Sequence, residues 1–219
     1  MKELSVFIPW IEPLVLHCPM PAMRTALRDT AIEFCRTTKV LQITTDLQSA
    51  YPNVAEYDLQ LPPFHNATIL MSAWYGVSQM APLYVVGADG MDFPAFLNPQ
   101  LSGVPTYGPR RAGLMDGNTT VRIYPLPDPA NPGYLSFRVA IVPTRECNQL
   151  NDQLFDQWLD AMVQGTVARL AQTPGQTYTS LTAAGNATIA YNHEKTRATI
   201  QATKGNALVS DRITMRPMA

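Results

Sequence analysis

The chain has 219 residues, of which 46% are hydrophobic and 15% are charged, and its formal net charge is −1. This length can bury a sizeable core without disulfides or a structural metal. The charge balance excludes a protein that coats nucleic acid through a strong basic surplus. An average domain has about 25% charged residues. The low share of charged residues predicts that part of the surface contacts other protein. The alternative is a surface rich in Ser, Thr, Asn and Gln.

Three cysteines, Cys18, Cys35 and Cys147, are widely spaced, and no two of them have the spacing of a metal site. We therefore expect free thiols, a reducing compartment and no metal. No stretch approaches 18 apolar residues, and the N-terminus lacks the apolar core of a signal peptide. The sequence thus predicts a protein that is made in the cytosol and has no membrane contact.

The first residues are rich in proline. Residues 1–21 contain Pro9, Pro13, Pro19 and Pro21, which predicts an extended arm on a surface, because a helix cannot run through so many prolines. From Met23 onward, apolar residues recur at spacings of three and four and predict a helix. Cys35 lies on its apolar stripe and is expected to be a buried, unreactive thiol.

The middle of the chain has a different pattern. Thirteen of the 19 prolines lie between residues 39 and 147, separating short segments that are rich in β-branched and aromatic residues. This pattern predicts an antiparallel β region. The expected strands are residues 40–44, 56–61, 67–75, 82–86, 120–124 and 134–142. We expect the last two to form a hairpin around the proline-rich segment 125–133.

Residues 93–117 have no regular period and contain four prolines and four glycines. A loop of this length in a compact domain is usually functional or disordered. It contains two adjacent arginines, Arg110 and Arg111, which would meet a phosphate or a partner carboxylate if they are not simply solvated.

Residues 154–170 give the strongest helical pattern in the chain. The apolar stripe comprises Phe155, Trp158, Leu159, Met162, Val163, Thr166, Val167 and Leu170. Asn151 or Asp152 should cap its start, and Pro174-Gly175 should end it. Gly165 inside the helix predicts either a close approach by another backbone or a tolerated glycine on the solvent face.

Residues 178–203 predict a further helix, whose small side chains would allow close packing and which would end at Gly205. Residues 207–219 alternate apolar and polar side chains. This tail could add as a strand to a partner, or it could be a frayed terminus.

The sequence contains no catalytic or cofactor motif. His17, His65 and His193 lie in no metal-binding or nucleophile motif, and no glycine-rich phosphate loop occurs. We therefore expect no enzymatic activity, no cofactor and no metal.

These patterns predict an α+β fold, with an antiparallel helical bundle of three main helices, a large inserted antiparallel β region, and extended N- and C-terminal arms. The helical domain would comprise residues 1–38 and 148–219, and residues 39–147 would form the β-rich insertion. Packing among the core helices would use Leu27, Phe34, Phe155, Leu159, Met162, Gly165 and Leu170.

Three blocks of sequence carry a resemblance. The first is Cys18-Pro19 with ALRDTAIEFCR at 26–36, and the second is VAIVPTR at 139–145. The third is AMVQGTVARL at 161–170, followed by PGQTY at 174–178, Ala183-Ala184 and KTR at 195–197. Taken together, the blocks resemble the head-to-tail adaptor proteins of short-tailed bacteriophages.

The resemblance implies a structural virion protein. Twelve copies would form a ring at the head–tail interface, with the portal above, the tail nozzle below and DNA passing through the lumen without sequence-specific binding. The protein would be made in the host cytoplasm and found in the virion. The residues expected to contact the portal are Leu208, Val209, Ile213 and Met215. Arg110 and Arg111 would contact the tail or a neighbouring subunit.

Two other interpretations stay open. One is another head- or tail-completion protein of the virion neck. The other is a small enzyme or ligand-binding domain with a site formed by the 93–117 loop and His65 or Asp92. A cleft with clustered titratable groups would favour the enzyme, whereas apolar and backbone-pairing surfaces at two opposed ends would favour the ring.

Overall fold

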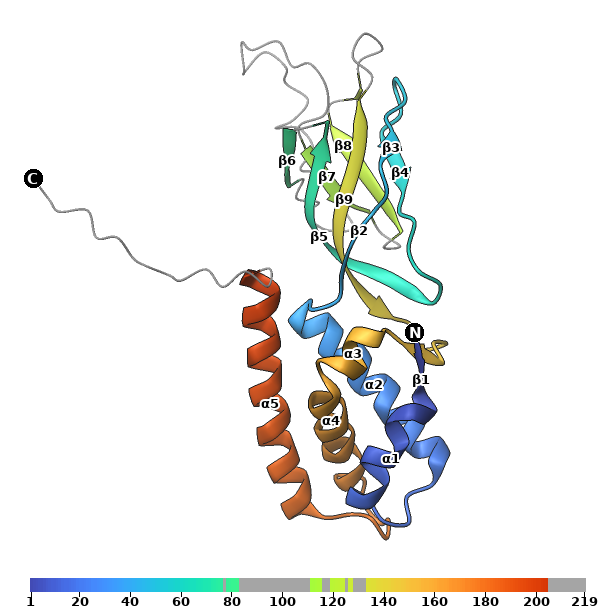
Figure 1. The fold of residues 1–219 in the computed structure, drawn as a ribbon, viewed down its shortest axis with the longest axis vertical. Coiled ribbons are helices and arrows are strands. Elements are labelled where there is room, and N and C mark those ends of the chain that lie inside the picture. The colour runs from blue at the N-terminus through green and yellow to red at the C-terminus, as the bar shows by residue number, and fades with distance from the viewer. Residues whose placement is uncertain (77, 83–110, 116–118, 125, 128–132, 205–219) are drawn as a thin grey trace, which may run out of the picture.

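A computed structural model describes residues 1–76, 78–82, 111–115, 119–124, 126–127 and 133–204. Helices gather at one end of the molecule and a large sheet occupies the other (Figure 1). Buried side chains from both ends belong to one hydrophobic core cluster. The described residues therefore form an α+β structure with a continuous core.

Within the described residues, the helical end contains five α-helices. They are α1 (Ile8–Ile11), α2 (Met20–Thr38), α3 (Asp152–Asp156), α4 (Leu159–Ala171) and α5 (Leu181–Lys204). Two 3-10 helices, η1 (Leu4–Phe7) and η2 (Glu12–Leu14), flank α1. α4 packs against α2 and α5, and also contacts α1.

The sheet end contains β2 (Gln42–Thr44), β3 (Gln48–Ser49), β4 (Glu56–Asp58), β5 (His65–Tyr75), β6 (Ser78–Pro82), β7 (Arg111–Leu114), β8 (Thr120–Tyr124) and β9 (Tyr134–Pro143). Seven of these strands pair in the order β2-β9-β5-β6-β7-β8-β4, and β3 also pairs with β9. The β6–β7 pair is parallel, and the other pairs are antiparallel. A separate two-stranded ladder joins β1 (Lys2–Glu3) to β10 (Gln149–Leu150).

Strand β9 connects the two ends of the molecule. Its first half alternates buried and half-buried residues, as a strand with one covered face does. Residues 139–143 are buried without alternation, because β2 and β5 flank this part of β9 and α2 packs against it. The sequence VAIVP therefore reads as a continuous apolar run.

The predicted antiparallel bundle of three main helices is wrong, since the described residues contain five α-helices that do not form such a bundle. One cause is the break of the predicted helix 154–170 into α3 and α4. Trp158 leaves the helical backbone, with φ −126° and ψ 23°. Its indole is buried 5.6 Å from the Phe34 ring, measured between ring centroids. The apolar spacing continues through this break, so the sequence pattern does not reveal it.

The predicted N-terminal arm is also wrong. Residues 2–14 form β1 and three short helical segments. Pro9 and Pro13 each stand in the first turn of a segment, where the missing N–H would have no partner in the helix. Phe7 and Ile11 are fully buried, so this segment is part of the core.

The predicted hairpin between residues 120–124 and 134–142 is wrong as well. β8 pairs with β4 and β7, whereas β9 pairs with β2, β3 and β5. Residues 111–114, which we placed in a long loop, form strand β7. Several predicted features lie outside the described residues. They are strand residues 83–86, loop residues 93–110 with Arg110, and the tail with Leu208, Val209, Ile213 and Met215.

One predicted end signal is confirmed. The Asn151 side chain, one of the two predicted candidates, accepts a hydrogen bond of 2.9 Å from the Gln153 N–H and caps α3. The helix predicted from Met23 is α2, which begins at Met20 and ends at Thr38, and its C-cap residue Lys39 adopts the left-handed conformation with φ 56°. The predicted domain boundaries at residues 38/39 and 147/148 stay predictions.

Candidate functional site

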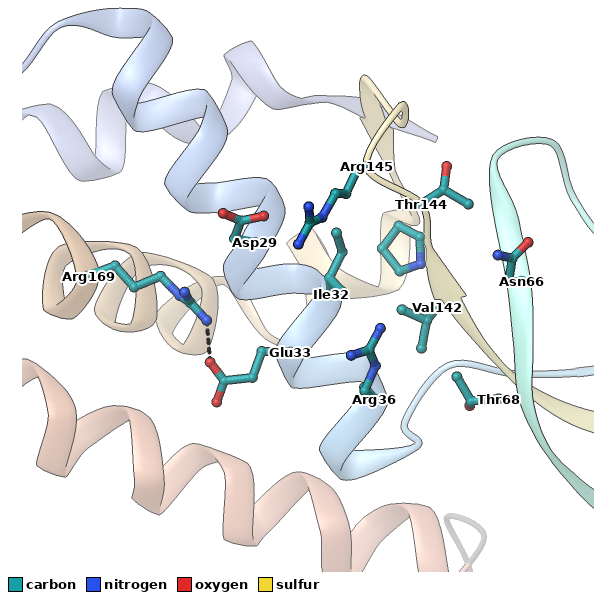
Figure 2. Close-up of a pocket in the computed structure, with 11 residues that line it drawn as sticks. Asp29, Ile32, Glu33, Arg36, Asn66, Thr68, Val142, Thr144, Arg145 and Arg169 are labelled. Atoms are coloured by element: carbon teal, nitrogen blue, oxygen red, sulfur yellow. Dashed lines mark hydrogen bonds and ion pairs between the residues drawn. The ribbon is translucent and has the colours of Figure 1, made fainter. Parts of the chain in front are cut away.

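A cleft of about 520 Å³ lies where the helical end meets the sheet. Its walls are α2, the first residues of β5, the end of β9 and the turn that follows it, with Arg169 of α4 at one side (Figure 2). The cleft therefore draws on segments that are far apart in the sequence.

Helix α2 supplies one whole wall. Asp29, Ile32, Glu33 and Arg36 line the cleft, and their spacings of three and four place them on one face of the helix. The opposite face, with Leu27 and Phe34, is fully buried. Sequence reasoning did not predict a site on this face, although the regular spacing of its polar residues was an available signal for a shared surface.

Glu33 ties three helices together at the edge of the cleft. Its carboxylate forms ion pairs with Arg169 of α4 and, at 2.8 Å, with the Lys195 Nζ of α5. Burial alone would raise the pKa of this carboxyl. The hydrogen bonds and positive charges of Lys195 and Arg169 outweigh burial and hold the pKa below its usual value of 4.5. Glu33 is therefore an ionised structural link.

The remaining cationic groups of the cleft have no such partner. Among the described residues, neither the Arg36 side chain nor the Arg145 side chain forms a hydrogen bond or an ion pair. The Thr144 Oγ1 atom is buried and also has no hydrogen-bond partner in the described part of the chain. The lining contains no Ser, Cys or His. This arrangement offers several donors for a negatively charged group.

The residues predicted for helix packing lie mainly inside the protein. Leu27 and Phe34 of α2 and Met162, Gly165 and Leu170 of α4 are buried, and Phe155 and Leu159 are partly buried against the core. Their assignment as the packing set stays a prediction.

Gly165 marks the tightest approach between α4 and its neighbours. A Cβ built there would lie 2.5 Å from Thr30 Cγ2 and 2.8 Å from Tyr191 Cε2. The neighbours of this glycine are thus side chains of α2 and α5. Neither sequence-based alternative, a neighbouring backbone or open solvent, describes the site.

The alternative ligand site at the 93–117 loop is not assembled by the described residues. His65 begins β5 opposite Pro143, whereas β6 and then β7 follow from the other end of β5. The structure therefore places His65 and Arg111 at different ends of the sheet, and Asp92 lies outside the described residues.

None of the three cysteines lines the cleft. Cys18, Cys35 and Cys147 are buried free thiols, and burial strongly raises the pKa of Cys35. In the part of the chain that the structure describes, no group of His, Cys, Asp and Glu side chains is placed to hold a metal ion. Nor does any helix in that part have the length and apolarity to cross a membrane.

Two exposed apolar surfaces lie on the helical end. The N-terminal stripe consists of Val6, Trp10, Leu14, Leu16 and Met20. The α5 stripe consists of Leu181, Ile189 and Ile200, of which Ile189 is 72% exposed. α4 lies between α1 and α5 in Figure 1. The two exposed apolar sets therefore belong to segments on either side of α4, and Ile189 also lines an open cleft with Asp160 and Gln164 of α4.

Comparison with known proteins adds no relative to this description. The sequence matches no known family model, and a search of curated proteins finds no match either. The functional argument therefore depends on the residues and the geometry above.

Proposed function

We propose that the protein is a ring-forming adaptor, twelve copies of which join the portal of a virion head to the tail nozzle and let DNA pass through the lumen. The sequence blocks described above support this proposal. The observation that carries it is the presence of two separate exposed apolar stripes, one on the N-terminal segment and one on α5.

Such a pair of surfaces suits head-to-tail association. When two different patches of one subunit bind each other in neighbouring copies, the contact is heterologous, and it generates a closed ring if the rotation closes. Large apolar side chains grouped on a surface usually mark a contact with another protein. Burying Trp10 or Ile189 in a neighbour would supply about 1.5–3 kcal/mol each.

The exposed residues with a formal charge differ in sign between the two stripes. In segment 2–20 they are Glu3 and Glu12, and along residues 181–203 of α5 the exposed charged residue is Arg197, which pairs with Glu194 at 3.0 Å. Each segment also has one exposed histidine, His17 and His193. Opposite charges at the rim of a contact favour one register between copies. An overall charge of −1 also suits a channel along which DNA slides.

The test is the mass of the purified chain in solution, alone and mixed with the portal protein encoded in the same genome. We expect a ring-sized species, formed either by the chain alone or only on the portal. A chain that stays monomeric and never binds the portal contradicts the proposal.

A further inference from the structure

We propose that the cleft between α2 and the end of β9 binds a phosphate-type oxyanion, a function that is independent of ring formation. In Figure 2 the Arg145 side chain extends toward α2 between Asp29 and Ile32, and Arg36 lies on the other side of Ile32. Neither guanidinium is paired with any described residue. Each can therefore donate to a ligand without first losing an internal ion pair.

The local charge has the opposite sign to that of the whole chain. Arg36, Arg145 and Arg169 line the cleft, and Lys195 reaches Glu33 at its edge. These four cations face two carboxylates, Asp29 and Glu33, which leaves a surplus of two positive charges in a chain of net charge −1. Glu33 is already shared between Arg169 and Lys195, so Asp29 is the acidic group in the cleft that would compete with an anion.

The donors come from several directions. Asp29 and Arg36 are two helical turns apart, about 10 Å along α2, and Arg145 approaches the same face from the turn after β9. Thr144, next to Arg145, holds a hydroxyl that is buried and has no hydrogen-bond partner among the described residues. A phosphate group has enough oxygens to accept from two guanidinium forks together, whereas a carboxylate has only two.

The experiment uses the full chain and inorganic phosphate at constant ionic strength, with chloride as the reference anion. Binding is measured by titration calorimetry and by the shift in unfolding temperature. We expect phosphate to bind and stabilise the chain where chloride does not. Arg36→Gln and Arg145→Gln should each weaken phosphate binding about tenfold, because each removes a charged donor.

Two further variants sharpen this test. Arg24→Gln removes an exposed arginine of α2 that does not line the cleft, and phosphate binding should be unchanged. Asp29→Asn removes the competing carboxylate and should tighten binding severalfold. Circular dichroism checks that every variant is folded. Equal stabilisation by phosphate and chloride, or unchanged binding in the Arg36→Gln, Arg145→Gln double variant, overturns the proposal.

The phosphate can come from a free anion or from a DNA backbone, and a short DNA duplex as the second probe separates these sources. DNA binding that disappears in the Arg36→Gln and Arg145→Gln variants assigns the cleft to backbone phosphates. Phosphate binding without DNA binding assigns it to a free anion. Ring formation is measured on the same samples, so failure of the cleft proposal and failure of the adaptor proposal give different results.

Discussion

At position 165 the three longest helices leave no room for a side chain. A Gly165→Ala substitution gains about 1 kcal/mol of helix propensity, but its Cβ would meet Thr30 Cγ2 at 2.5 Å and the Tyr191 ring at 2.8 Å. Overpacking of this kind costs about 1–3 kcal/mol. We expect a net loss of stability in urea unfolding.

Gly185 provides the matched control. It also lies in a helix, α5, but a Cβ there would meet no atom within 4 Å. Gly185→Ala should therefore stabilise the protein by about 0.5–1 kcal/mol. Equal effects at both positions would show that helix propensity, and not the close packing at Gly165, decides the result.

Glu33 should give stability a specific pH dependence. The pKa of its carboxyl is lower in the folded state than the ordinary value of 4.5. The stabilisation is therefore fully present above pH 4.5 and is lost as pH falls through the folded-state pKa. The side chain is 39% exposed, so solvent screening limits the effect to less than about 1 kcal/mol.

The measurement compares urea unfolding of wild type and Glu33→Gln between pH 3 and pH 7. The stability difference should be constant near neutral pH and shrink as the wild-type carboxylate becomes protonated. Glu56→Gln, which removes a 3.7 Å pair with Arg122 at the sheet end, should show a smaller difference. A gap between wild type and Glu33→Gln that is unchanged down to pH 3 would contradict the assignment.

At the scale of elements, the two stripes make assembly depend on two separate surfaces. Trp10→Asp should disable the N-terminal stripe, and Ile189→Asp should disable the α5 stripe, because each places a charge in the proposed contact. Either variant alone should form no ring. A mixture of the two retains one intact contact per pair of chains, so native mass spectrometry should detect a one-to-one dimer.

Leu47→Asp is the control for these variants, since Leu47 is 72% exposed and belongs to neither stripe. It should assemble like the wild-type chain. If Trp10→Asp and Ile189→Asp also assemble normally, the stripes are not the contact between copies. A mixture that stays monomeric would argue against a head-to-tail arrangement.

At the scale of the whole molecule, the helical end and the sheet end share one hydrophobic core cluster, which includes Phe34 of α2 and Phe137 of β9. We therefore expect one cooperative unfolding transition. Trp158 reports on the helical end and Trp74 on β5. The third tryptophan is Trp10, so the Trp10→Phe, Trp74→Phe and Trp10→Phe, Trp158→Phe double variants each leave one signal. Two separated fluorescence midpoints would show that the ends unfold independently.

The sequence by itself determined features that depend on neighbouring residues. The spacing of apolar residues located α2 and most of α5, and alternation located β5, β8 and β9. Asn151 was one of two candidate helix caps, with Asp152, because capping is a contact between residues close together in the chain. The burial of Cys35 followed from the same helical stripe.

Only the tertiary structure decided how these segments combine. It pairs β8 with β4 and β7, breaks the apolar helix at Trp158, and packs the proline-rich N-terminus into the core. It also brings Arg36, Arg145 and Arg169 to one cleft from three segments. Each of these outcomes depends on contacts between residues far apart in the chain, and a local hydrophobic period carries no information about which distant segments will meet.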